Sequence, residues 1–262
     1  MDVADKVAFT GSTAVGRILR QRIAGSGKKI SLELGGKSPV VVFDNADLDS
    51  AVESTVDAIW FNQGQVCCAG SRLLVQESIY DPFINKVKER MSHLRLGHSL
   101  DKCIDMGPLV DESQYISVKG YVDQAKAEGA EVFHAPICVP EGGWFYPPTL
   151  ITNVEPTSTC VREEIFGPVL VAMSFRSPEE AISLANNTHY GLGGSVHTEN
   201  LSLAIEVWYL PCFSPCNMIR WLSALKQVQS GLIVTTCSTL QLDLVHFITM
   251  LKDVKTCCRR LS

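Results

Sequence analysis

Two adjacent cysteines, Cys67 and Cys68, lie in the stretch FNQGQVCCAGSR at residues 61–72. The stretch follows a helix-like segment and precedes a strand-like one, and its glycines would let the backbone approach a bound molecule. A cysteine becomes nucleophilic where partial exposure and nearby N–H groups stabilise its thiolate. The residues alone leave three roles open, since the two thiols could be a structural pair, metal ligands or a nucleophile.

A metal site is the role that the spacing supports least. The sequence contains ten cysteines, but no CxxC pairs with the spacing of a zinc site. Cys212 and Cys216 with Cys257 and Cys258 are the one loose alternative. Without a secretory signal, reduced thiols are favoured over disulfides. We therefore predict no metal centre.

A second candidate for chemistry, Glu33, lies between two apolar residues and just before the glycine pair of LELGGK at residues 32–37. Partial burial there would make its carboxylate a better general base for work near neutral pH. An ion pair between Glu33 and Lys37 at the end of a strand explains the same residues. Spacing alone does not separate the two roles.

Two further segments could contact a cofactor. Gly11-Ser12-Thr13 opens a helical pattern, where free N–H groups favour a phosphate, although an ordinary N-cap explains the turn equally well. In EEIFGP at residues 163–168, a carboxylate could bind a ribose diol and the aromatic ring could pack beside a nicotinamide. A surface turn with a residue anchored in the core is the alternative.

The elements that would position these residues alternate between strands and helices. Residues 40–43, introduced by Pro39, are apolar on both faces, as in a buried parallel strand. Asp47 is a plausible N-cap for an amphipathic helix that runs to Phe61 and leads into the cysteines. Further strands are expected at residues 6–11, 31–34, 73–75, 131–134 and 169–175, and further helices at 14–19, 83–94, 114–128 and from the capping box at 177–180.

This alternation predicts an α/β fold with a mostly parallel sheet. With 262 residues, the chain is long enough for one large domain or two small ones. The pattern weakens from Trp208 onward, where aromatic residues, cysteines and prolines follow no settled period.

Composition and charge exclude several classes of protein. The net charge of −5 and the lack of a dense Lys/Arg run argue against a nucleic-acid partner. Residues 231–251 are long enough to be tested as a membrane span, but Asp243 and His246 argue against one. The first ten residues have the pattern of neither a secretory signal nor a transit peptide, so we expect a cytoplasmic protein without a membrane partner.

Taken together, four segments resemble the aldehyde dehydrogenase superfamily in their order and approximate spacing, namely FTGSTAVGR, LELGGKSPVVVFDNADLD, FNQGQVCCAGSR and EEIFGPV. The resemblance runs from about Phe9 to Val207 and includes YGLGGSV at residues 190–196. ERMSHLRLG, DMGPLV and FYPPTL look most like the family 16 branch of that superfamily.

The resemblance implies a role for each catalytic candidate. Cys67 matches the nucleophile, whereas Cys68 matches a neighbour that the chemistry does not require. Glu33, which lies 34 positions before Cys67, matches the general base. The implied reaction is the oxidation of an aldehyde to a carboxylic acid through a thioester on the cysteine.

The resemblance also implies a cofactor, which is NAD, with NADP possible. Gly11 and Ser12 match the phosphate-binding turn. Gly35 and Glu164 match positions that contact the cofactor, the carboxylate at the ribose, and Phe166 matches the ring contact beside the nicotinamide.

Family members are longer than this chain, so the resemblance implies a partial aldehyde dehydrogenase-like fold. We expect the end of a Rossmann-like cofactor domain at residues 1–34, a catalytic domain at 35–207 and a divergent tail at 208–262. The family's oxyanion-hole asparagine, its ribose-contacting lysine and its Pro-Phe-Gly-Gly segment have no counterpart. Missing strands would leave a sheet edge open, which favours a homo-oligomer or pairing with a full-length relative. A non-catalytic interaction module is therefore the alternative function.

Overall fold

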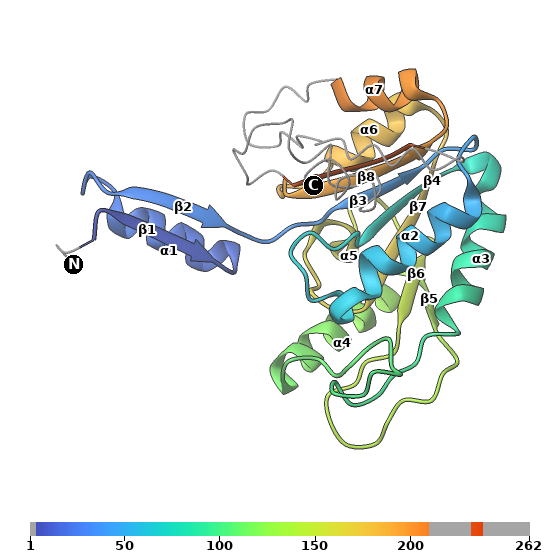
Figure 1. The fold of residues 1–262 in the computed structure, drawn as a ribbon, viewed down its shortest axis with the longest axis horizontal. Coiled ribbons are helices and arrows are strands. Elements are labelled where there is room, and N and C mark those ends of the chain that lie inside the picture. Colours follow the sequence, from blue (N-terminus) through green and yellow to red (C-terminus); the bar gives the residue numbers. More distant parts are fainter. Residues whose placement is uncertain (1–3, 210–231, 238–262) are drawn as a thin grey trace, which may run out of the picture.

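The computed structural model describes residues 4–209 and 232–237, which form a small N-terminal unit and a larger body (Figure 1). In the small unit, β1 (Lys6–Thr10) and β2 (Lys29–Glu33) pair in parallel and are connected by α1 (Thr13–Ile23). Figure 1 shows this unit to one side of the body, joined to it by the segment that follows β2. The unit is thus a single βαβ motif.

The body is built on a seven-stranded sheet with the strand order β5-β6-β7-β4-β3-β8-β9. The five central strands, from β6 to β8, run parallel to one another, whereas the edge strand β5 pairs antiparallel with β6 and the edge strand β9 antiparallel with β8. The strands are β3 (Pro39–Val42), β4 (Arg72–Gln76), β5 (Glu131–His134), β6 (Thr149–Thr152), β7 (Val169–Phe175), β8 (Gly193–Thr198) and β9 (Leu232–Cys237).

Helices cover both faces of this sheet. One face packs against α2 (Leu48–Trp60) and α3 (Tyr80–Met91). The other packs against α4 (Glu112–Ala127), α5 (Thr159–Arg162), α6 (Pro178–Asn186) and α7 (Leu201–Tyr209). Short 3-10 turns lie at Phe61–Gly64 and Glu77–Ile79.

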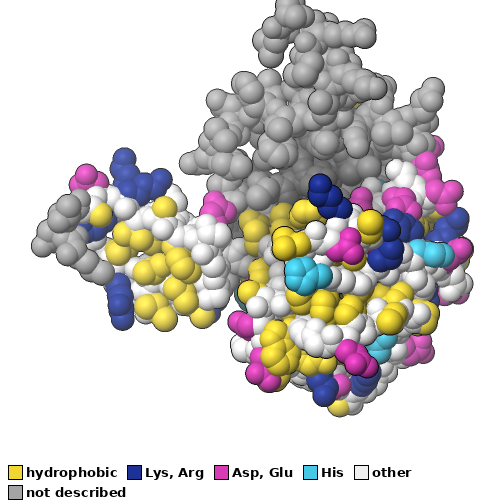
Figure 2. Space-filling view, turned by 60° about the horizontal axis from the view of Figure 1, so that its bottom comes forward, with side chains coloured by type: hydrophobic (Ala, Val, Ile, Leu, Met, Phe, Trp, Pro, Cys, Tyr) yellow, Lys and Arg dark blue, Asp and Glu magenta, His cyan; other side chains and the backbone are white. Residues whose placement is uncertain are grey.

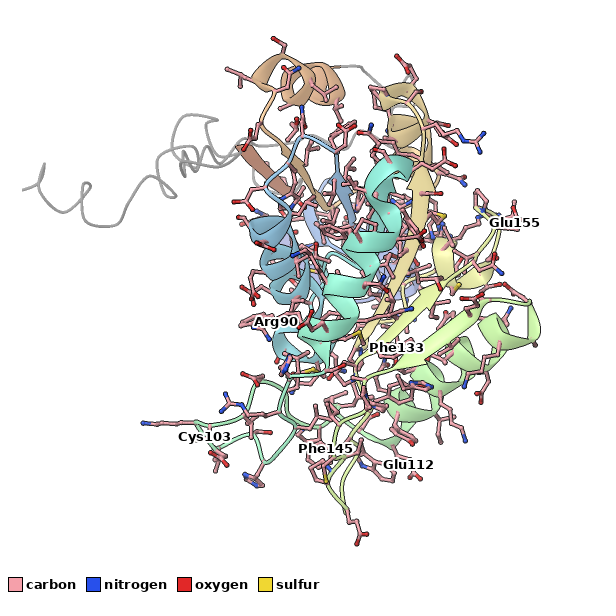
Figure 3. All side chains as sticks on the ribbon, turned by 90° about the vertical axis from the view of Figure 1, so that its right-hand side faces the viewer. Arg90, Cys103, Glu112, Phe133, Phe145 and Glu155 are labelled. Carbon is pink, nitrogen blue, oxygen red and sulfur yellow. The ribbon has the colours of Figure 1, made fainter. Side chains whose placement is uncertain are left out.

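Two long loops extend past one end of the sheet, where Figure 3 labels Cys103 on one and Phe145 on the other. The first loop is closed on itself, because the Arg95 guanidinium donates to the Asp105 carboxylate at 3.0 Å. The two loops are joined where the Leu109 N–H donates to the carbonyl of Trp144 at 2.8 Å. They therefore lead into α4 and β6 from a shared, hydrogen-bonded base.

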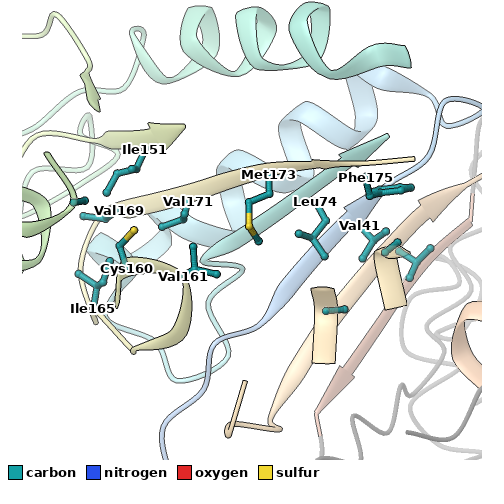
Figure 4. Packing of buried hydrophobic residues seen from close by; sticks show 14 of the residues in the cluster. Val41, Leu74, Ile151, Cys160, Val161, Ile165, Val169, Val171, Met173 and Phe175 are labelled. Atoms are coloured by element: carbon teal, nitrogen blue, oxygen red, sulfur yellow. The ribbon is translucent and has the colours of Figure 1, made fainter. Parts of the chain in front are cut away.

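Burial on both faces explains the apolar runs in the central strands. Val41 and Leu74 belong to the core under α4 to α7 (Figure 4). Their neighbours Val40 and Leu73 belong to the core under α2 and α3. A strand that is covered on both sides cannot alternate polar with apolar residues. The predicted α/β class with a mostly parallel sheet is confirmed.

Most of the predicted elements are confirmed, including two helix starts. The Asp47 side chain accepts from the N–H groups of Asp49 and Ser50, and Ser177 caps α6 ahead of Pro178. The strands β6, β8 and β9 and the helices α5 and α7 were not expected. β9 lies in the stretch that was tested as a membrane span, the rest of which lies outside the described residues, as do Cys212, Cys216, Cys257 and Cys258.

Membrane spans and metal clusters are both absent from the described ranges, 4–209 and 232–237. No helix there has the length and apolar character that crossing a membrane requires. No group of three or more His, Cys, Asp or Glu side chains there is arranged to hold a metal ion.

Candidate active site

Three loops meet at the amino ends of three neighbouring strands. The glycine loop (residues 34–38) leads into β3, the cysteine loop (residues 61–71) into β4, and the turn at residues 163–168 into β7. Because β7, β4 and β3 are adjacent and parallel, the residues just before them lie at the same end of the sheet, where these strands begin. The candidates Cys67 and Glu164 both lie at this end, and Glu33 lies directly before the glycine loop.

The cysteine loop begins with a sharp reversal of the chain at the end of α2. Asn62, Gln63 and Gly64 are consecutive left-handed residues, with φ of 48°, 57° and 71°. This conformation is costly for residues other than glycine, so surrounding contacts must hold it. At the far end, Gly70 donates to the carbonyl of Ala58 at 2.9 Å. The loop thereby presents a partly exposed Cys67 and an exposed Cys68.

Gly35 and Gly36 bring all three loops into contact. The Gly36 N–H donates to Glu164 Oε1 at 3.1 Å. A Cβ atom on Gly35 would lie 2.0 Å from Glu164 Oε2, and one on Gly36 would lie 2.3 Å from the carbonyl oxygen of Cys67. Only glycine allows this approach, because real Cβ contacts are not that short. The glycine pair of LELGGK therefore contacts both the backbone of the candidate nucleophile Cys67 and the candidate ribose carboxylate of Glu164.

Gly36→Ala is expected to displace the backbone of Cys67 and to destabilise the fold by about 1–3 kcal/mol, the usual cost of overpacking. Thermal unfolding and the rate of Cys67 alkylation measure the two effects. Gly120→Ala is the matched control, because Gly120 lies within α4 and a Cβ added there would meet nothing within 4 Å. The control should stabilise the chain slightly. Equal stability of the two variants would contradict the proposed approach.

The cysteine loop also packs directly on the turn at residues 163–168. A Cβ atom on Gly64 would lie 2.1 Å from the carbonyl oxygen of Gly167. Trp60, the last residue of α2, donates from its ring N–H to the carbonyl of Pro168 at 3.2 Å. In the turn it is Ile165 that is buried in the core, whereas the Phe166 side chain is 38% exposed. The alternative of an ordinary surface turn therefore does not describe all of its contacts, because the turn also packs against the cysteine loop.

Gln114 is a part of this site that the sequence analysis missed. From the first turn of α4, its amide nitrogen donates to the carbonyls of Ile165 at 3.0 Å and Phe166 at 2.9 Å. Phe166 has a left-handed φ of 56°, and these two bonds stabilise that conformation. A single glutamine near the start of a helix does not reveal this role in the sequence, since the carbonyls to which it donates lie about fifty residues further along the chain.

Charge in the site centres on Glu164 and Lys37. Burial raises the pKa of Glu164, while the Gly36 N–H and the Lys37 ammonium act in the opposite direction. Burial, followed by the nearby Arg72 guanidinium, lowers the pKa of Lys37 to about 7. Glu163 accepts a 3.4 Å hydrogen bond from the Tyr190 hydroxyl.

Glu33 stands at the junction of the small unit and the body. Its carbonyl accepts from the Gly11 N–H at 2.9 Å, which ties it to the candidate phosphate turn. The residue is partly buried, and the expected alternative of an ion pair with Lys37 is wrong. Lys37 points into the core, and the ion pairs of the described residues lie on the surface of the body.

Ser12 accepts from the Val15 N–H at 3.4 Å and thus caps α1, which confirms the N-cap interpretation of that turn. The turn belongs to the small unit, which lies to one side of the body (Figure 1). Its role toward a phosphate stays a prediction.

Comparison with known proteins gives a consistent result over most of the chain. The model of the aldehyde dehydrogenase family matches residues 2–209. An aldehyde dehydrogenase of Alternaria alternata is 46% identical over 208 residues, which cover 79% of this chain and 42% of that protein. The human mitochondrial aldehyde dehydrogenase is 45% identical over 202 residues, which cover 76% and 39%.

Solved structures agree with these relatives. The betaine aldehyde dehydrogenase of Staphylococcus aureus in complex with NAD+ matches with a TM-score of 0.75 and 39% identity, over 78% of this chain and 41% of that one. An aldehyde dehydrogenase of Bacillus cereus matches with a TM-score of 0.75 and 41% identity, over 78% and 41%. The chain thus spans about two fifths of the length of the proteins it matches.

Proposed function

The chain belongs to the aldehyde dehydrogenase family, and from this premise we propose that it oxidises an aldehyde to a carboxylic acid with NAD as the electron acceptor. The observation that carries the proposal is the contact at Gly36. There the loop that follows Glu33 touches the backbone of a partly exposed Cys67 and the carboxylate of Glu164. Nucleophile, base and cofactor ligand are thereby connected through one segment of chain.

In the proposed reaction, the Cys67 thiolate attacks the carbonyl carbon of the aldehyde and forms a tetrahedral adduct. The Cys67 backbone N–H supplies half of an oxyanion hole for the negative charge on oxygen. A bound NAD would supply the acceptor for the hydride that leaves this carbon. Glu33 then removes a proton from a water molecule that attacks the Cys67 thioester, and the acid is released with the thiolate restored.

The residues around the site fit a dinucleotide. The free N–H groups at the start of α1, beside Gly11 and Ser12, favour a phosphate. Gly35 has no side chain to occupy the space beside the Glu164 carboxylate. Glu164 Oε1 is held by the Gly36 N–H, so Oε2 can accept a ribose hydroxyl, and the part-exposed ring of Phe166 offers a face to the nicotinamide. NADP fits these same positions.

Replacing the base should separate the two halves of the reaction. Glu33→Gln is expected to release NADH in an amount equal to the protein and then stop, because the thioester forms but is not hydrolysed. Rapid-mixing absorbance measures the burst, and mass spectrometry of the intact chain measures the acyl adduct. Glu89→Gln, an exposed change on α3, should behave as the unaltered chain. Steady turnover by Glu33→Gln would remove Glu33 from the role of base.

The function itself is tested by incubating the chain with NAD and a short aliphatic aldehyde. NADH and carboxylic acid should form in equal amounts. A chain that is folded by circular dichroism and forms neither product would reject the proposal.

The alternative, a non-catalytic interaction module, has one observation in its favour. The helix α1 exposes Val15 at 41% and Ile18 at 48%. An apolar helix face on a two-stranded unit favours a partner, which would be a second copy or a full-length relative. Figure 2 shows apolar side chains gathered on this unit. Association measured by light scattering, without product formation, would support this alternative.

A further inference from the structure

The cysteine loop has a second neighbour besides the turn at residues 163–168, namely the first long loop (residues 92–111). The Val110 N–H of that loop donates to Gln65 Oε1 at 3.1 Å. A Cβ atom on Gly107 would lie 2.8 Å from the side-chain amide of Gln63. Both glutamines of the cysteine loop therefore contact the first long loop, and Gln65 lies two positions before the candidate nucleophile.

Gln65 also closes the left-handed turn at the start of the cysteine loop. Its N–H donates to the carbonyl of Asn62 at 3.0 Å, and the Asn62 side-chain amide donates to the carbonyl of Gln65 at 3.2 Å. Asn62 and Gln63 have left-handed conformations, which are costly for residues other than glycine. The backbone of Gln65 thus holds the turn closed, while its side chain joins the turn to Val110.

The part of the first long loop that contacts Gln65 is itself fixed to the body. We call residues 106–114 the anchored segment. Met106 is buried in the core under α2 and α3, and Leu109 is buried in the core under α4 to α7. The Asp111 side chain then caps α4. Protein cores are close-packed and resist displacement, so this segment can define the position of a loop that is hydrogen-bonded to it.

The anchored segment contacts two of the three loops of the candidate active site. At Val110 it donates to the cysteine loop. Four residues later, the Gln114 side chain donates to the carbonyls of Ile165 and Phe166. The loop of the candidate nucleophile and the turn of the candidate nicotinamide contact are thus held by one short piece of chain. Hydride transfer between them depends steeply on how the reacting atoms are placed.

We propose that Gln65 is a positioning residue, which fixes the cysteine loop against the anchored segment and so sets the position of the Cys67 thiolate relative to Phe166. The inference rests on the proposed function in assigning Cys67 as nucleophile and Phe166 to the nicotinamide. In this role Gln65 contacts Val110 and not the reacting atoms. Its loss therefore moves the thiolate without changing the thiol itself.

Gln65→Ala is expected to change two rates in opposite directions. It should lower kcat about tenfold with little change in KM, because the aldehyde still binds but the reacting atoms are misplaced. It should raise the limiting rate of Cys67 alkylation by iodoacetamide about fivefold, because that reaction needs only exposure and one hydrogen bond no longer holds the loop. A residue that stabilised the thiolate would lower both rates when removed, and a merely structural residue would lower kcat together with the melting temperature.

Gln76→Ala is the matched control. Gln76 Oε1 accepts from the Asp44 N–H at 3.0 Å, which is the same kind of bond at the opposite end of β4, and its loss should change neither rate. Gln65→Glu is the rescue variant, since a carboxylate also accepts from the Val110 N–H. Its alkylation rate is taken from the high-pH limit of the pH profile, where the thiol is fully ionised and the added charge no longer affects that ionisation. This limit should return to that of the unaltered chain.

Hydrogen exchange separates a failure of this inference from a failure of the proposed function. In the 15N-labelled chain, Gln65→Ala should speed exchange of the Val110 amide, and Gln76→Ala should speed that of the Asp44 amide instead. Neither exchange nor alkylation needs NAD or aldehyde, so a folded chain without turnover rejects the proposed function and still tests Gln65. An alkylation limit that falls or stays unchanged in Gln65→Ala, or that Gln65→Glu does not restore, would overturn the inference. An unchanged kcat in an active chain would do the same.

Discussion

Cys67→Ser is expected to lower NADH formation by at least about 10³-fold, because a serine hydroxyl at this position is far less ionised and less nucleophilic than a thiolate. The change replaces one small atom, so the loop should keep its contacts with Gly36. Cys68→Ser is the matched control in the neighbouring position. It alters an exposed side chain that the proposed reaction does not use, and its activity should stay near that of the unaltered chain.

Alkylation with iodoacetamide distinguishes the two cysteines without relying on turnover. Peptide mapping should show Cys67 modified in proportion to lost activity, while the buried Cys160 stays unmodified in the folded chain. Loss of activity in Cys68→Ser but not in Cys67→Ser would make Cys68 the nucleophile instead. Inactivity of the unaltered chain, if folded, would favour the interaction module.

The parts of the fold that the sequence predicted well are those with a strong local signal. Residues 40–43 are apolar on both faces and rich in β-branched side chains, and such a short run favours a covered strand in an α/β protein. Asp47 and Ser177 are capping residues whose partners lie within three positions, so their sequence pattern suffices. The cysteine loop was placed correctly because the elements on both sides of it are regular.

The unexpected elements depend on contacts distant in sequence. β9 is the edge strand of the sheet and pairs with β8. Its strand conformation therefore depends on hydrogen bonds to β8 and not on a regular alternation of polar and apolar residues in its own sequence. The contacts of Gly36 with Cys67 and of Gln114 with Phe166 likewise join separate segments. A single sequence contains no measure of such proximity.

The wrong ion pair between Glu33 and Lys37 has a particular physical reason. Glu33 ends β2 in the small unit, whereas Lys37 already belongs to the approach to β3 in the body. The glycine pair between them interrupts the regular alternation of side chains, so a spacing of four residues says little about which groups meet. Lys37 is consequently buried, at 2% exposed, and its ammonium does not meet Glu33.

Arg72→Met is expected to destabilise the chain by about 3–5 kcal/mol, a large part of the stability of a typical domain. Arg72 is 0% exposed and donates to the carbonyls of Lys37 at 2.9 Å, Leu184 at 2.9 Å and Ala185 at 2.6 Å. Methionine fills a similar volume but removes the donor of the Lys37 and Ala185 carbonyls, whereas the Leu184 carbonyl still accepts from the Asn187 N–H at 3.2 Å. Two of these carbonyls end α6, so the loss spreads from β4 to that helix.

Arg176→Met is the matched control, since Arg176 pairs with Glu77 on the surface and its side chain is 77% exposed. Surface pairs contribute about 0–1 kcal/mol, so the control should be nearly neutral. Urea unfolding of both variants measures the difference. Arg72 begins β4, just after the cysteine loop, and it donates to the carbonyl of Lys37, which is next to Gly36. Removing this bond should therefore also speed the alkylation of Cys67, measured at urea concentrations at which the chain is still folded. Equal losses of unfolding free energy in the two variants would show that the hydrogen bonds of Arg72 do not stabilise the contact between the cysteine loop and the glycine loop.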